Sequence, residues 1–446
     1  MPPITVEKQA GTVASLERYF EFAALGTDWR TETLAGLTTF VTMAYIIFVN
    51  PSILHEAGMP LAAVTAATCF SAALGSFLMG ALARYPIALA PGMGLNAYFT
   101  YSVVKGMGVP WQTALGAVFL SGIIFMLLTL GGIRQRLVSA IPHELHAAVA
   151  GGVGLFIAFI GLRNAGIIAP NAATLVGLGN LRDPMTMLAI FGMLLIAILQ
   201  VFRVRAAMLL GILGTTAVGW LFHLVRWQPQ SYRLADITAT AFKLDIRGVL
   251  HVGAFEIIFV FLFVDLFDNI GTLLAVTKKA GLMDESHRIP RLDKVLFADA
   301  TATIAGSMAG TSTVCSYIES SAGVAAGGRS GVTAIVTGLL FLIALFVAPL
   351  VGAVPLAATA PALIIVGGLM LSTIGEIAWD DPLVAIPAFL TLIIIPLTYS
   401  IANGLSFGIT SFALLQVLSG RFKRENWMLY LLAILFALRF VYMARG

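Results

Sequence analysis

The chain carries few charged residues for its length. Asp, Glu, Lys and Arg make up only 11% of the 446 residues, whereas apolar residues make up 59%. Soluble domains carry about 25% charged residues. Since so few charges cannot cover a water-facing surface of this size, lipid must solvate much of the molecule. The net charge of +4 comes from basic residues scattered in short loops, which argues against a nucleic-acid-binding face.

Cysteines and targeting signals are also scarce. The 2 cysteines, Cys69 and Cys315, lie inside apolar segments and lack the spacing of metal ligands. The sequence therefore favours free thiols over a disulfide, and we expect no metal and no cofactor. Residues 1–30 contain several charged residues and lack the apolar centre of a signal peptide, and we expect them to form a cytoplasmic segment.

Long apolar segments fill most of the remaining sequence. Two of them, 87–106 and 308–327, are rich in glycine, proline and hydroxyl residues, and we interpret them as broken spans. The stretch 426–443 is either a surface helix or an extra span. Twelve further segments are long enough, or nearly so, to cross about 30 Å of hydrocarbon: 31–50, 60–83, 110–132, 145–166, 184–202, 206–225, 252–276, 295–309, 331–353, 357–374, 382–398 and 400–419.

The spacing of these segments indicates an internal repeat. The first span begins near 31 and the eighth segment near 252, and the two broken spans begin near 87 and 308. Both pairs are about 220 residues apart. Because a unit of seven segments is odd, the second unit enters the membrane from the opposite side. We therefore predict an all-α polytopic membrane protein with 14 transmembrane segments in a 7+7 inverted repeat. Basic loop residues concentrate on the side of both termini, which predicts cytoplasmic ends.

The two broken spans differ in composition from lipid-facing helices. Residues 311–318 are rich in β-branched, Cys and Tyr residues, which favour extended backbone. Unpaired backbone at membrane depth is tolerated only inside protein or beside a cavity. We therefore expect short extended strands in segments 3 and 10 to pair, with the half-helices after them pointing their N-termini at a ligand. The alternative is that the glycines serve only close helix packing.

Acidic residues inside spans are the clearest functional signal. Asp265, Asp268 and Asn269 are spaced i, i+3 and i+4, so they share one helix face. Asp299 lies within the next span, and Glu319 lies in the second broken span. A carboxylate at membrane depth costs several kcal/mol and usually marks an ion or substrate path. The alternative is that some of them, above all Asp299, cap a half-helix.

Four stretches carry specific motifs: 36–51, 91–96, 265–271 and 311–323. Together they resemble the AzgA-like (azaguanine-type) purine permeases of the nucleobase–ascorbate transporter group, and the likeness extends over roughly 30–420. It implies symport of adenine, guanine or hypoxanthine with protons across a bacterial plasma (inner) membrane, with no enzymatic activity. Members of this group also suggest a homodimer.

The resemblance implies two domains. A core domain would comprise 31–142 (spans 1–4) and 250–354 (spans 8–11). A gate domain would comprise 143–249 (spans 5–7) and 355–420 (spans 12–14). The cytoplasmic segment 1–30 precedes them, and a basic and apolar segment, 421–446, follows them.

The resemblance also assigns roles to single residues. Asp268 matches the eighth-span carboxylate of the group, Asp299 its ninth-span aspartate, and Glu319 the tenth-span residue that contacts the base. The wider group often has Gln-Asn where Glu319-Ser320 stands here, which favours the purine branch. The implied substrate-binding residues are Asp268, Glu319, Tyr317, Ile318, Asn96, Leu95 and Thr39. The implied proton-coupling residues are Asp268, Glu319, Asp299 and Asp265.

Two rival functions can be compared with these residues. An anion exchanger of the same fold would use helix N-termini, with or without a cation, and an acidic pair would work against it. An intramembrane enzyme is suggested by Asp265-Leu-Phe-Asp268, which is similar to the Asp-x-x-Asp motifs that hold magnesium diphosphate in membrane prenyltransferases. Such enzymes need a second acidic motif on a facing helix, and Asp299 and Glu319 are single.

Overall fold

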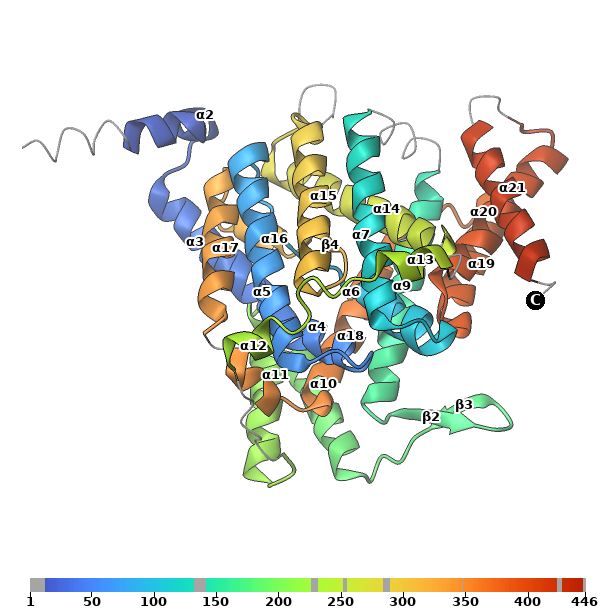
Figure 1. The fold of residues 1–446 in the computed structure, drawn as a ribbon, viewed down its shortest axis with the longest axis horizontal. Helices are drawn as coiled ribbons and strands as arrows, with labels where there is room; N and C mark the ends of the chain where they lie inside the picture. The colour runs from blue at the N-terminus through green and yellow to red at the C-terminus, as the bar shows by residue number, and fades with distance from the viewer. Residues whose placement is uncertain are drawn as a thin grey trace, which may run out of the picture.

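The computed structural model describes residues 13–131, 142–225, 232–251, 255–283, 289–346, 348–422 and 427–443. Within its helices, a few side chains also lie outside the described set, and that of Asp268 is one of them. The described chain is mostly helical and forms one body of packed, upright helices (Figure 1).

The first half of the chain contains the following elements: α2 (Phe22–Leu25), α3 (Trp29–Met43), α4 (Ile46–His55), α5 (Leu61–Leu78), η1 (Met79–Ala83), β1 (Leu89–Pro91), α6 (Met93–Ala97), η2 (Tyr98–Gly106), α7 (Trp111–Leu130), α9 (His143–Asn164), β2 (Ile168–Asn171), β3 (Leu175–Leu178), α10 (Pro184–Val201) and α11 (Ala207–Leu221).

The second half contains these elements: α12 (Leu234–Ile237), α13 (Ile246–His251), α14 (Phe255–Ala280), α15 (Leu292–Ala309), β4 (Val314–Ser316), α16 (Ser320–Ala325), α17 (Gly331–Ala344), η3 (Ala348–Ala353), α18 (Leu356–Met370), η4 (Leu371–Glu376), α19 (Pro382–Thr398), α20 (Ile401–Leu418) and α21 (Trp427–Met443).

Helix length and hydropathy agree with a multi-span membrane protein. Among the described residues, 8 helices are long and apolar enough to cross a membrane, and α11, α17, α19 and part of α21 are shorter apolar helices. The predicted spans thus correspond to helices, although α15, which contains the predicted span 295–309, is not among these apolar ones. The total of fourteen stays a prediction.

Helix α21 packs along α20 (Figure 1). Its Leu429, Leu432 and Phe436 are buried, and the Phe436 ring lies against Phe259 of α14. The opposite face of α21, with Leu431 and Leu438, is also apolar, which suits lipid better than the polar surface of an interfacial helix.

The two broken segments pair through their extended parts, as the sequence predicted. Strand β1 lies antiparallel to β4, with Leu89 opposite Ser316 and Pro91 opposite Val314. All residues of both strands are buried. Main-chain polar groups at this depth need partners inside the protein, and each strand supplies them for the other.

A hydroxyl clamp holds each strand in the same way. In the first repeat, Ser76 Oγ on α5 accepts from Leu89 N at 3.1 Å and donates to Leu89 O at 3.3 Å. In the second, Thr303 Oγ1 on α15 accepts from Val314 N at 3.1 Å and donates to Val314 O at 3.0 Å. These matching contacts support the inverted repeat that spacing alone had indicated.

The helices form two groups. The first helix group, α3, α5, α7, α15 and α17, packs around the strand pair, and the second, α9, α10, α11, α18, α19 and α20, packs beside it. Each group contains a close glycine contact: a Cβ on Gly331 would lie 2.0 Å from Gly80 O, and one on Gly367 would lie 2.3 Å from Gly154 O. At these positions glycine serves helix packing, as in many membrane proteins.

A second strand pair was not predicted. Strands β2 and β3 form an antiparallel hairpin after α9, and it projects away from the helices (Figure 1). Asn171 Oδ1 accepts from the main-chain N of Ala173 and Thr174 and so fixes the turn. Leu175 and Leu178 on β3 are exposed.

Candidate functional site

The paired strands place two half-helices near the middle of the molecule. Gly92 N donates to Thr313 O at 3.0 Å, and Tyr317 N donates to Ala88 O at 3.0 Å, so the pairing extends past both strand ends. The Tyr317 hydroxyl donates to Pro91 O at 2.6 Å. Helices α6 and α16 begin directly after this junction. Helix α6 packs against α4, α9 and α14, and α16 packs against α3 and α14.

Glu319 lies at the junction, where β4 leads into α16. Its side chain is half-buried and forms no capping hydrogen bond to α16. The hydroxyl of buried Tyr45, between α3 and α4, donates to Glu319 Oε1 at 2.6 Å. The neighbouring Ile318 is 49% exposed although Tyr317 is buried, so the chain reaches an accessible surface at this point. The sequence did not single out Tyr45, although it lies within the motif 36–51.

A cluster of two carboxylates lies behind this junction, and Asn269 connects them. Asn269 Nδ2 donates to Asp265 Oδ1 at 3.1 Å and to Asp299 Oδ2 at 3.0 Å. Asn269 Oδ1 accepts from Ser316 N at 2.7 Å. Residues of α14, α15 and β4 therefore meet at one amide, and all three side chains are buried. Asp299 lies mid-way along α15 and accepts a hydrogen bond from the Asn269 side chain of α14, and the alternative that it caps a half-helix stays untested.

A similar amide lies in the first repeat. Asn50 Nδ2 on α4 donates to Thr68 Oγ1 at 2.7 Å and to Thr311 Oγ1 at 3.0 Å. Its Oδ1 accepts from Asn96 Nδ2 on α6. Asn50, like Asn269, is fully buried. We call the two groups the Asn50 hub and the Asn269 hub.

The remaining predicted residues lie around the junction, with one exception. Leu95 and Asn96 are buried on α6. Thr39 is buried on α3 against α16, since a Cβ on Gly323 would lie 2.0 Å from its Oγ1. The main chain of Asp268 is part of α14, and its side chain lies outside the described residues.

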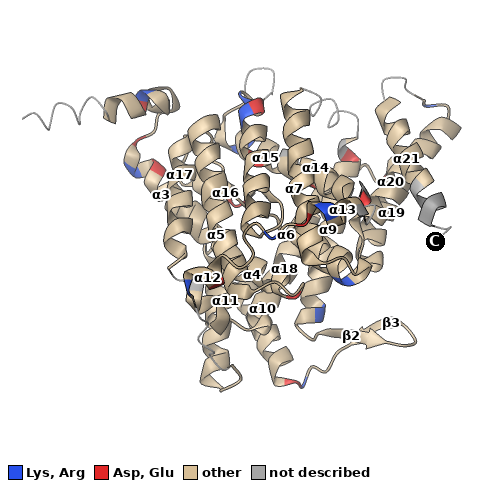
Figure 2. Ribbon diagram, viewed as in Figure 1, with Lys and Arg blue, Asp and Glu red and all other residues tan. Residues whose placement is uncertain are grey.

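The described residues offer no metal centre. No group of three or more His, Cys, Asp or Glu side chains with metal-binding geometry occurs among them. Cys69 and Cys315 are buried and are not joined by a disulfide, as the sequence predicted. Charged residues gather mainly toward the ends of the helices and in the loops, whereas the helix middles are largely uncharged (Figure 2).

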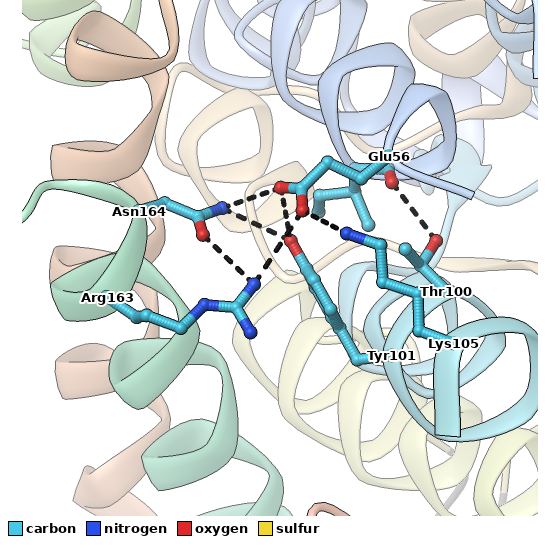
Figure 3. A network of polar contacts seen from close by, with 7 residues as sticks. Glu56, Thr100, Tyr101, Lys105, Arg163 and Asn164 are labelled. Carbon is cyan, nitrogen blue, oxygen red and sulfur yellow. Dashed lines mark hydrogen bonds and ion pairs between the residues drawn. The ribbon is translucent and has the colours of Figure 1, made fainter. Parts of the chain in front are cut away.

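A second polar network lies at one end of the spans. It joins α4 and η2, which pack against α5 and α7 of the first helix group, to α9 of the second. Glu56, after α4, accepts from Tyr101 and Lys105 of η2 at 2.7 and 2.6 Å (Figure 3). Asn164 of α9 donates to Glu56 Oε1 at 2.9 Å, and Arg163 Nη2 lies 3.7 Å from Glu56 Oε2. Burial alone would raise the pKa of Glu56, but the bonds from Lys105 and Tyr101 and the charges of Lys105 and Arg163 outweigh it and lower the pKa.

The inverted repeat, the paired half-helices and the buried acids define a multi-pass α-helical membrane transporter. The Permease family (Xan_ur_permease) matches residues 30–407. The chain belongs to this family, and thus to the nucleobase–ascorbate transporter group. It is a transporter and not an enzyme, so the prenyltransferase-like alternative is wrong.

Relatives and solved structures agree with this assignment. Adenine permease AdeP of Escherichia coli (strain K12) is 44% identical over 427 residues, which cover 96% of each chain. Guanine/hypoxanthine permease PbuG of Bacillus subtilis (strain 168) is 46% identical over 440 residues, 96% of this chain and 100% of the relative. The transmembrane domain of a cyanobacterium bicarbonate transporter, BicA, has a TM-score of 0.64 at 14% identity, covering 86% of this chain and 98% of that one. This last likeness shows the fold alone.

Proposed function

We propose that this protein imports purine nucleobases, namely adenine, guanine or hypoxanthine, by symport with protons. The names of its relatives support a purine substrate. The observation that carries the proposal is the position of Glu319 at the junction of the paired half-helices. Only two residues separate it from Ser316, whose N–H the Asn269 hub binds.

The chemistry of this junction suits a neutral base. A purine is flat and carries ring N–H and amine donors, which a carboxylate accepts, while main-chain N–H groups serve its ring acceptors. Tyr317 and Tyr45 provide aromatic surface beside Glu319. Carboxylates close to one site do not all ionise easily, so one of Glu319, Asp268, Asp265 and Asp299 would carry the coupled proton.

The two helix groups suggest how the site opens. We infer that the first group, with α14 and α16, acts as the core domain and the second as the gate domain, with boundaries at 31–142, 143–249, 250–354 and 355–420. The junction would then face one side of the membrane at a time as the groups move against each other. The Glu56 network would hold them together at one end.

An anion transporter is the second candidate, because a bicarbonate transporter shares the fold. Buried carboxylates beside the junction count against it, since they repel an anion. Uptake of sulfate or bicarbonate without nucleobase uptake would favour this candidate.

Uptake into proteoliposomes tests the proposal. Radiolabelled adenine, guanine, hypoxanthine, xanthine and uracil are offered with and without an inward proton gradient. We expect gradient-driven purine uptake by the wild type and its loss in Glu319→Gln. Glu376→Gln, at an exposed glutamate of η4, is the matched control and should transport normally. Vesicles that take up no nucleobase would overturn the purine assignment, and normal uptake by Glu319→Gln would overturn the role of that carboxylate.

A further inference from the structure

The Asn269 side chain uses its donor and acceptor sides for different kinds of partner. Ser316 N can only donate, so the oxygen of the Asn269 amide must face strand β4. The nitrogen then necessarily faces the acidic side, where it donates to Asp265 and Asp299. The orientation of this amide is therefore fixed by chemistry, and no flipped form satisfies all of its partners.

Replacement of this amide would leave several groups without partners. The hub is completely buried, so water cannot replace a lost bond to Ser316 N or to either carboxylate. An N–H donor also favours the ionised form of a carboxylate over the protonated form. The amide thus responds to the charge of the acidic pair on one side and holds the main chain of β4 on the other.

We propose that Asn269 is the positioning residue that couples the protonation of the Asp265–Asp299 pair to the substrate junction. A proton on the pair weakens its hydrogen bonds to Asn269 Nδ2. Because Asn269 Oδ1 binds Ser316 N, the change reaches β4 and then Tyr317 and Glu319, which follow it in the chain. This inference rests on the proposed proton symport, and it assigns the link between the proton and the base to a residue that itself binds neither.

Few other ionisable groups surround this hub among the described residues. Strand β4 and the following turn contribute Cys315, Tyr317 and Glu319. Helices α6, α7 and α20, which pack against α14, contain no ionisable acid or base. Those of α9 lie near its ends, at His143, Glu144, His146 and Arg163. Asp268 lies on α14 itself, one position before Asn269.

The test compares pH profiles of purine uptake for Asn269→Ala, Asn269→Asp and the wild type. Loss of a hydrogen bond to charged groups should lower gradient-driven uptake at neutral pH by about ten-fold or more in Asn269→Ala. It should also move the pH of half-maximal uptake upward by about one unit, because the protonated pair is no longer disfavoured. In Asn269→Asp, acid should restore uptake, since a protonated carboxyl regains the donor that faces the pair.

Asn50→Ala is the matched control for disturbed packing. Asn50 is equally buried and hydrogen-bonds to three residues outside its own helix, but these partners, Thr68, Thr311 and Asn96, are not titratable. It should lower uptake without moving the pH profile. Thermal unfolding in detergent checks that each variant is folded.

Three results would overturn the proposal or its basis, and they are distinguishable. The absence of proton-driven purine uptake by the wild-type protein would contradict the proposed function itself. A functional wild type with unchanged pH profiles in both Asn269 variants would reject the positioning role alone. Failure of acid to restore uptake in Asn269→Asp would also reject the positioning role, because a purely structural role predicts no recovery. This variant decides even if Asn269→Ala does not fold.

Discussion

The two repeats share a backbone arrangement but differ in charge. Each has a hydroxyl clamp on its strand, from Ser76 or Thr303. Each also has a buried asparagine that connects neighbouring segments. The Asn50 hub has hydroxyl and amide partners, whereas the Asn269 hub has two carboxylates. The two repeats therefore share their backbone scaffold, while the ionisable partners of the buried asparagine are found in the second repeat.

In each repeat a carboxylate binds the start of a helix, α17 or α7, but the two contacts differ in strength. In the first, Glu32 of α3 is fully buried and accepts from Arg329 N, Ser330 N and Thr333 N, at the beginning of α17. In the second, Asp245 accepts from Thr113 Oγ1 of α7 at 3.4 Å, a weaker contact nearer the surface. A carboxylate at a helix N-terminus is favourable in both cases.

Removal of Glu32 and of Asp245 should give the largest difference in stability between the two repeats. We expect Glu32→Ala to lower the free energy of unfolding by about 3–5 kcal/mol, because it leaves several buried N–H donors and the Thr333 hydroxyl without their charged acceptor. Asp245→Ala should cost only about 1 kcal/mol. Denaturant unfolding in detergent micelles measures both values. Equal losses would show that the two helix starts are equivalent after all.

The hydroxyl clamps should behave alike. We expect Ser76→Ala and Thr303→Val each to lower the free energy of unfolding by about 1–3 kcal/mol, since each leaves a buried main-chain N–H without its partner. The same unfolding assay measures both. Thr65→Val is a useful control, because the Thr65 hydroxyl bonds only within its own helix, to Leu61 O. A large loss for one clamp and none for the other would contradict the equivalence of the repeats.

Much of this architecture followed from local patterns. The broken spans were recognised because 87–106 and 308–327 have the wrong composition for lipid, and their pairing followed from the need to satisfy main-chain groups. Asp265 and Asn269 were placed on one face by helix periodicity alone. Their connection to Asp299 depends on the packing of α14 against its neighbours, which local patterns do not predict. The family resemblance assigned Asp299 a role in proton coupling but no contact with Asn269.

Other contacts carried no signal in the sequence. Tyr45 and Glu319 are 274 positions apart, and Asn164 and Glu56 are 108 apart. Nothing local marks these residues as partners, because their meeting depends on the packing of whole helices. The β2–β3 hairpin was missed for a different reason: its strands are 4 residues each and mostly exposed, so they lack the alternation of buried and exposed side chains that identifies a strand.

The ends of the first span in each repeat offer the last and smallest contrast. Glu56 follows α4 and is bound by η2 and α9 (Figure 3). About 220 residues later, at the corresponding end of α14, stand Lys278 and Lys279, and both are exposed. The hydrogen bonds and ion pairs of the half-buried Glu56 should stabilise the fold, whereas the exposed lysines should contribute little. This stabilisation should depend on pH, because the pKa of Glu56 is lowered in the folded protein.

We expect Glu56→Gln to lower the free energy of unfolding by about 1 kcal/mol at pH 7, since the group is partly exposed and solvent screens the ion pairs. Because the pKa of Glu56 is lower in the folded protein, its contribution is present above the ordinary carboxyl value of 4.5 and disappears as pH falls through the lowered value. Thermal unfolding of wild type and variant between pH 3 and 7 should therefore give curves that converge in acid. Arg421→Gln, which breaks the exposed pair with Asp381 at 3.3 Å, should match the wild type throughout. A difference for Glu56→Gln that stays constant into strong acid would show that hydrogen bonding, and not the charge of Glu56, holds the two helix groups together at this end.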